Sequence, residues 1–151
     1  MGTSAYSDVR PSPIAGSWYP GNAAELRAVV ESFLERAAAP ALSGEILALV
    51  VPHAGYIYSG FTAAHAFKAL IGSRFSRVIL LSPSHQYYRE PLLTSGHEAY
   101  ATPLGAIPVD REALTALGRL LQAASGPDIT PIRRDREHSL EIELPFLQVV
   151  L

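Results

Sequence analysis

The stretch ILALVVPHAGYIYSG, residues 46–60, decides the predicted fold. Its first six residues, 46–51, are all apolar, which is typical of a strand covered on both faces in a parallel sheet. A second apolar run at 78–81 follows a segment, 61–70, whose apolar residues recur at helical spacing. A strand, a helix and a strand in this order predict a right-handed crossover between parallel strands.

The flanking sequence predicts further elements of an α/β fold. Asn22 is suited to cap a helix that ends before Pro40, and Asp110 is suited to cap a leucine-rich helix that ends near residue 121. Residues 102–105 indicate a turn and residues 129–132 a short strand, whereas residues 139–147 fit either a strand or a helix. We therefore expect a mainly parallel central sheet flanked by helices.

Composition bounds the class of protein. The 151 residues are 48% hydrophobic and 17% charged, which favours one globular domain over a disordered chain. The formal net charge of −2 gives no basic field for nucleic acid or for an anionic membrane surface, and no apolar run reaches the roughly 20 residues of a membrane span. The chain has no cysteine, which excludes a thiolate metal site built from this chain alone and favours a cytoplasmic protein.

Two histidines each follow one of the apolar runs. His53 comes just after the first and His85 just after the second. Because carboxyl ends of parallel strands meet at one edge of a sheet, we expect the two imidazoles to converge there. Neutral imidazoles bind iron, zinc or copper, so the pair is a candidate metal site. The alternative is that each histidine only caps a strand end by hydrogen bonding.

A third candidate lies in the sequence EHSLE, residues 137–141. On a helix, His138 and Glu141 would share one face at positions i and i+3. His138 could then supply a further ligand or a general acid or base. Alternatively, it is a structural histidine paired with Glu141.

Other polar residues are assigned more simply. Tyr56 and Tyr58 flank His53 and are candidate pocket residues, whereas His65 is expected to be solvated and His97 stands alone in an apparent loop. The mixed-charge residues 133–137 are expected to form a solvated face with weak local ion pairs.

Five ordered motifs together resemble the Memo-like protein family, also called AmmeMemoRadiSam system protein B. They are AGSWYP (15–20), PHAGY with YSG (52–60), PSH (83–85), TPLG (102–105) and EHSLE with LPF (137–146). The resemblance implies a fold similar to class III (LigB-type) extradiol dioxygenases. It also implies a mononuclear metal at His53 and His85, iron or copper with zinc as a further option, and a proton-transfer role for His138. Ser84 and Glu141, both within these motifs, join the candidate pocket residues.

Members of that family are about twice as long as a 150-residue domain. Their second half supplies another histidine and a cysteine or carboxylate to the metal site. Residues 1–151 are therefore expected to form the N-terminal half of a single Memo-like domain, with bare apolar surfaces that favour self-association. Bacterial and archaeal members also imply radical-SAM and AMMECR1-like protein partners.

Three functions follow as hypotheses. The first is a metal-dependent redox or dioxygenase-like protein acting on a small molecule. The second is a non-catalytic module that binds a peptide or protein in the same cleft. The third is a zinc hydrolase, which would need a carboxylate such as Glu141 close to a metal-bound water.

Overall fold

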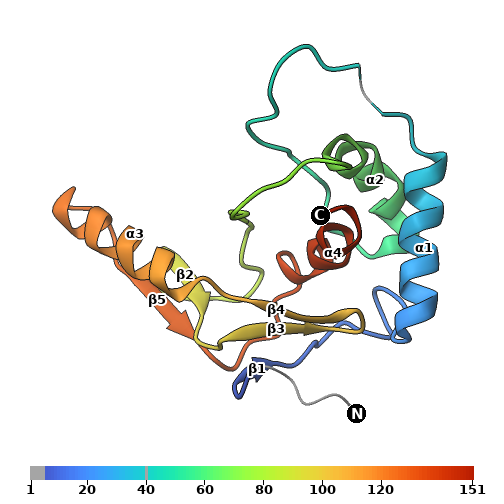
Figure 1. The fold of residues 1–151 in the computed structure, drawn as a ribbon. Helices are drawn as coiled ribbons and strands as arrows, with labels where there is room; N and C mark the ends of the chain where they lie inside the picture. The colour runs from blue at the N-terminus through green and yellow to red at the C-terminus, as the bar shows by residue number, and fades with distance from the viewer. Residues whose placement is uncertain (1–5, 40) are drawn as a thin grey trace.

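The computed structural model describes residues 6–39 and 41–151 and has a mixed α/β fold (Figure 1). Pro40, predicted to end the first helix, lies outside the described residues. The strands are β1 (Val9–Arg10), β2 (Leu92–Ser95), β3 (Ala99–Thr102), β4 (Gly105–Pro108) and β5 (Ile129–Ile132). The α-helices are α1 (Ala23–Arg36), α2 (Phe61–Phe67), α3 (Arg111–Ala123) and α4 (Leu144–Val150). A π-helical turn spans Tyr56–Gly60, and 3-10 turns span Lys68–Leu70 and Glu141–Glu143.

Helices α1, α2 and α4 form the hydrophobic core. Helix α1 begins as predicted, since the Asn22 side chain accepts hydrogen bonds from the backbone N–H groups of Ala24 and Glu25. The Phe67 ring of α2 stacks on the Phe146 ring of α4, with centroids 4.9 Å apart. The ambiguous C-terminal segment is thus helical. The buried hydrophobic residues of this core are Ile14, Tyr19, Leu26, Val30, Leu34, Ala37, Tyr56, Ala63, Ala64, Phe67, Leu70, Ile142, Phe146 and Val150.

The strands form two small sheets. In the first, β3 pairs with β1 in parallel and with β4 in antiparallel, across the predicted turn at 102–105. Gly105 in this turn has a φ of +126°, which favours glycine. In the second sheet, β2 and β5 run parallel. Helix α3, capped by Asp110 as predicted, lies beside this second sheet and away from α1, α2 and α4 (Figure 1).

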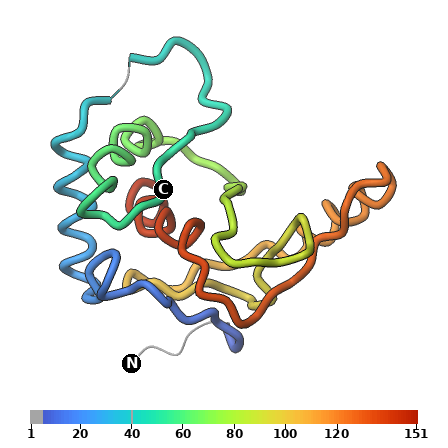
Figure 2. Tube along the Cα trace, turned by 180° about the vertical axis from the view of Figure 1, so that it is seen from behind, coloured from blue at the N-terminus to red at the C-terminus, as the bar shows by residue number. Residues whose placement is uncertain are grey.

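The predicted strands at 46–51 and 78–81 are wrong. Neither run has a ladder partner among the described residues, and Figure 2 shows both within long connecting segments. Many of their side chains are exposed, including Val50 at 98% and Leu81 at 91%. Because a strand needs a neighbour for its backbone N–H and C=O groups, an apolar run without one forms no sheet ladder. The mainly parallel central sheet built on these runs is therefore not confirmed.

A buried ion-pair network joins strand β1 to the segment before α4. Arg10 donates to Asp135 through Nε (3.2 Å) and to Glu141 through Nη1 (2.6 Å), and the side chains of Arg10 and Asp135 are only 4% and 5% exposed. Although burial would lower it, the hydrogen bonds that Arg10 donates to Asp135 and Glu141 raise the pKa of Arg10. The prediction that residues 133–137 form a solvated face is therefore wrong for Asp135.

A further buried carboxylate, that of Glu143, has no cation partner among the described residues. Glu143 is buried where α4 begins, and its Oε1 atom has no hydrogen-bond partner within the described part of the chain. Burial raises the pKa of Glu143 to about 8.

The helices of the described residues include none with the length and apolar character of a membrane span.

Removing the guanidinium of Arg10 should destabilise the fold. In Arg10→Met, the buried carboxylates of Asp135 and Glu141 lose their cation, which should lower the free energy of unfolding by about 3–5 kcal/mol. Arg27→Met is the matched control, since the Arg27–Glu31 pair is half exposed and should contribute about 0–1 kcal/mol. Urea unfolding of wild type and both variants measures the change in the free energy of unfolding. Equal midpoints would contradict the importance of the network.

Candidate metal site

Three histidines from distant parts of the sequence converge. His53, His85 and His138 each offer a ring nitrogen, and these atoms all lie within 4.8 Å of one another. The ring centroids of His53 and His85 are 5.3 Å apart, and those of His85 and His138 are 4.5 Å apart. The predicted convergence of His53 and His85 is confirmed. Connecting segments, rather than a sheet edge, bring them together.

Local hydrogen bonds anchor the segment that carries His53. Ser59 Oγ accepts from the backbone N–H of Ala54 and donates to its carbonyl, both at 3.1 Å. The backbone N–H of Tyr56 donates to the carbonyl of Trp18 at 2.9 Å. Gly60 lets this turn pack closely, because a Cβ there would lie 2.7 Å from Cε2 of Phe33. Ser59, the backbone of Tyr56 and the close packing at Gly60 therefore fix the loop that presents His53.

Ser139 anchors the segment that carries His85. Its hydroxyl donates to the Pro83 carbonyl at 2.6 Å and lies 3.0 Å from Ser82 Oγ. Ser139 directly follows His138 in the sequence, so these contacts bring the second and third histidines together. The serine of EHSLE and the PSH motif are therefore in contact in the folded chain.

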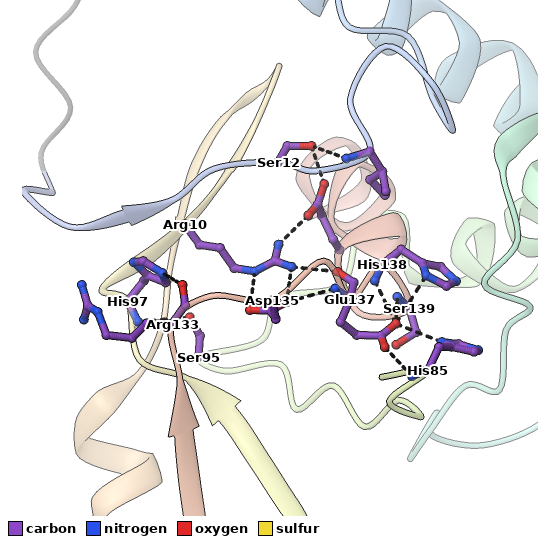
Figure 3. Close-up of polar contacts among 12 residues, drawn as sticks. Arg10, Ser12, His85, Ser95, His97, Arg133, Asp135, Glu137, His138 and Ser139 are labelled. Carbon is purple, nitrogen blue, oxygen red and sulfur yellow. Dashed lines mark hydrogen bonds and ion pairs between the residues drawn. The ribbon is translucent and has the colours of Figure 1, made fainter. Parts of the chain in front are cut away.

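Glu137 lies between two of the histidines (Figure 3). Its Oε1 atom is 3.0 Å from His85 Nδ1 and 3.4 Å from His138 Nδ1. The same atom accepts hydrogen bonds from the backbone N–H groups of His138 (2.8 Å) and Ser139 (3.0 Å). Burial alone would raise the pKa of Glu137, but hydrogen bonds from His85 and from three backbone N–H groups lower it to about 2. Glu137 is therefore ionised at neutral pH.

Sequence reasoning missed this role. The charge pattern assigns Glu137 to the mixed-charge residues 133–137, although its position directly before His138 in EHSLE is a signal for a role beside that histidine. The proposed pairing of His138 with Glu141 is also not observed. Glu141 is buried and accepts from Arg10, Ser12 and Tyr19, whereas the carboxylate beside His138 is that of Glu137.

The ring of His138 contacts three other rings, those of Trp18, His53 and His85. Its ring lies 4.1 Å from the Trp18 ring and stacks on His85 with an interplanar angle of 23°. Burial lowers the pKa of His138; the Glu137 carboxylate opposes this shift, and the charges of His85 and His53 add to it. A neutral imidazole has a free nitrogen lone pair at neutral pH, as metal ligation and proton acceptance both require.

The structure separates the four predicted pocket residues. Tyr56 is buried in the core and donates to the Ile142 carbonyl at 3.0 Å, and Glu141 belongs to the Arg10 network. Tyr58 and Ser84 are exposed, and Ser84 Oγ donates to the carbonyl of Gln86. Pocket roles for Tyr58 and Ser84 stay predictions.

The two remaining histidines lie outside the cluster. The His65 ring is hydrogen-bonded through Nδ1 to the backbone of Ala38, so it is not simply solvated. His97 is buried, contacts Asp8 at 2.7 Å and bonds the Arg133 carbonyl at 2.9 Å. Both rings thus have structural partners.

The donor set suits a transition metal. Three imidazole nitrogens with an open position are a known arrangement for zinc, and imidazole also binds iron and copper. Among the described residues, His53, His85 and His138 are the group of three or more potential ligands that could hold an ion. The residues present therefore fit such a metal, with His138 as the nitrogen that completes the set.

Comparison with known proteins identifies the family. The family model for Memo-like protein matches residues 10–151. The chain belongs to the Memo-like protein family. It is 36% identical over 141 residues to a "MEMO1 family protein" of Thermococcus onnurineus, covering 93% of this chain and 47% of the relative. It is 38% identical over 144 residues to the "Protein memo-1 homolog" of Caenorhabditis elegans, covering 94% of this chain and 39% of the relative.

The chain covers a similar share of another Memo-like protein. The chain is 36% identical over 149 residues to a relative from Methanopyrus kandleri, covering 93% of this chain and 52% of that protein. The chain thus spans about half the length of the curated relatives it matches.

The environment of His138 predicts its titration. In the metal-free chain, His138 should titrate below the usual value of about 6.5, because burial disfavours the imidazolium. NMR chemical shifts of the ring protons against pH measure this. A peptide of residues 136–140 is the control, since it keeps Glu137 but loses the burial. A His138 midpoint at or above that of the peptide would contradict the described environment.

Proposed function

We propose that this chain is a Memo-like metal-binding protein in which His53, His85 and His138 hold one transition-metal ion. The proposal rests on the spacing of the three histidines, each of which offers a ring nitrogen within 4.8 Å of the other two. Ion-to-nitrogen distances in such sites are about 2.0–2.1 Å, so nitrogens bound to one ion lie roughly 3–4 Å apart. Small ring rotations would bring the three histidines to that spacing.

We further propose a redox or dioxygenase-like role for the site, in a fold related to the LigB-type dioxygenases. The support is the resemblance of the histidine motifs together with a donor set that accepts iron or copper. When bound, such a metal would supply one-electron chemistry. A small molecule or peptide could approach on the side of His85, whose side chain is 46% exposed. Trp18 would shield His138 from water on another side.

Proton transfer is the second candidate role for His138. The lowered pKa of His138 favours a neutral ring that can accept a proton at neutral pH. In that case His53 and His85 would be the ligands, and His138 would exchange protons with a molecule bound beside them. The number of imidazoles on the metal distinguishes the two roles.

The hydrolase hypothesis has less support. It requires a carboxylate close to a metal-bound water. Glu141 instead accepts hydrogen bonds from Arg10, Ser12 and Tyr19, and Glu137, the carboxylate beside the histidines, already accepts from His85 and three backbone N–H groups. A peptide- or protein-binding role keeps the support of the exposed apolar runs at 46–51 and 78–81.

We also propose that these runs are covered by further polypeptide. The relatives are about twice as long, so the occupant we favour is their second half, adding strands beside the two runs. Self-association of this chain would be the substitute when that half is missing. Radical-SAM and AMMECR1-like proteins are proposed partners by family resemblance, and we place the cysteine-free chain in the cytoplasm.

Metal titration tests the proposed site. Wild-type chain should bind one Zn²⁺, Fe²⁺ or Cu⁺ ion, and His53→Ala or His85→Ala should weaken binding on the order of 100-fold, because each removes a ligand. His65→Ala is the matched control, since its ring hydrogen-bonds the backbone of Ala38 and contacts the Phe61 ring, outside the three-histidine cluster. Calorimetry gives affinity and stoichiometry.

The outcomes are separable. Equal metal affinity in wild type and both ligand variants would rule out this pair of histidines. Binding of zinc with no measurable affinity for iron or copper would contradict the redox role while leaving the metal site intact.

A further inference from the structure

We propose that Glu137 is a positioning residue that fixes which ring nitrogen of His85 faces the metal site. The proposal rests on the proposed function, because it assigns the orientation of one of the three candidate ligands. Glu137 itself does not join the set of ligand atoms in this role. It acts on the site through His85.

The geometry at His85 is a paired contact. Glu137 Oε1 is 3.0 Å from His85 Nδ1, and Oε2 accepts from the backbone N–H of the same residue. An ionised carboxylate only accepts hydrogen bonds, so the proton in the side-chain contact must sit on Nδ1. A neutral His85 ring then carries its free lone pair on Nε2. This nitrogen is the one left for a metal.

His85 has little else to orient it. Its side chain is 46% exposed, and its other described side-chain contacts are the rings of His53 and His138, which are themselves candidate ligands. An exposed imidazole without a fixed partner can rotate and can exchange its proton between the two nitrogens. The bond to Glu137 is therefore the contact that selects one orientation.

Glu137 is itself held in place. Its backbone N–H donates to Asp135 Oδ1 at 3.1 Å, and its carbonyl accepts from Arg10 Nη2 at 2.7 Å. Its side chain accepts three backbone N–H bonds, from His85, His138 and Ser139. A carboxylate fixed at both its backbone and its oxygens can set the angle of a ligand ring. The arrangement also places His138 next to His85, because one oxygen serves both.

A purely structural carboxylate would need only the backbone bonds. The backbone N–H of His85 already ties Glu137 to the loop of His85, and those of His138 and Ser139 hold the carboxylate within its own turn, so the imidazole bond adds nothing that this role requires. A structural role and a positioning role for Glu137 therefore differ in one observable, which is the ring nitrogen of His85 that carries the proton.

NMR of the imidazole nitrogens in the metal-free chain at pH 8 reads this pattern directly. We expect the Nδ1–H form of His85 in wild type and a shift toward the Nε2–H form, which predominates in free histidine, in Glu137→Gln. Glu98→Gln is the matched control, because Glu98 also accepts backbone N–H bonds but contacts Ser7 and Asp8. Zn²⁺ affinity should fall about 10–100-fold in Glu137→Gln and stay unchanged in the control.

Each result decides the proposal. The Nε2–H form in wild type would overturn it without any variant, so a Glu137→Gln chain that fails to fold does not remove the test. An unchanged His85 pattern in a folded Glu137→Gln chain would leave Glu137 a structural role only, as would unchanged zinc affinity. Absence of zinc binding in wild type with the expected Nδ1–H form would contradict the proposed function and not the contact.

Discussion

The buried guanidinium of Arg10 is the interaction on which the rest of the structure depends. It joins strand β1, at the start of the chain, to Asp135 and Glu141, more than 120 residues later. Two carboxylates taken out of water would be costly without it, so loss of the guanidinium would disfavour this pairing of segments. Because Arg10 also holds the Glu137 carbonyl, the same interaction fixes the backbone that carries Glu137 and His138.

The candidate site is built on this support from segments that are not in sheets. Ser59 holds the loop of His53, Ser139 holds the loop of His85, and Glu137 contacts two of the three rings. Fixed loops can hold ligands when hydrogen bonds replace the rigidity of strands. The exposed runs at 46–51 and 78–81 enter the same loops, so any polypeptide that covers them would also stabilise the site.

The sequence predicted the local elements better than their assembly. Caps at Asn22 and Asp110 and helical spacing depend on neighbouring residues, and both helices formed as expected. Strands at 46–51 and 78–81 depend on partners elsewhere, which the run itself cannot reveal. The convergence of His53 and His85 was predicted correctly but for the wrong reason, because hydrogen-bonded connecting segments and not paired strands bring the two rings together. The role of Glu137 could not be predicted, because a cluster of charged residues is expected to be solvated unless its distant partners, here Arg10 and His85, are known.

The most direct test of a single three-histidine site is X-ray absorption spectroscopy of the zinc-loaded chain. We expect three imidazole nitrogens on each zinc at about 2.0–2.1 Å, and two in a His138→Ala chain. Two imidazoles in wild type, unchanged by His138→Ala, would contradict His138 as a ligand. A zinc ion surrounded by water oxygens would contradict the site itself.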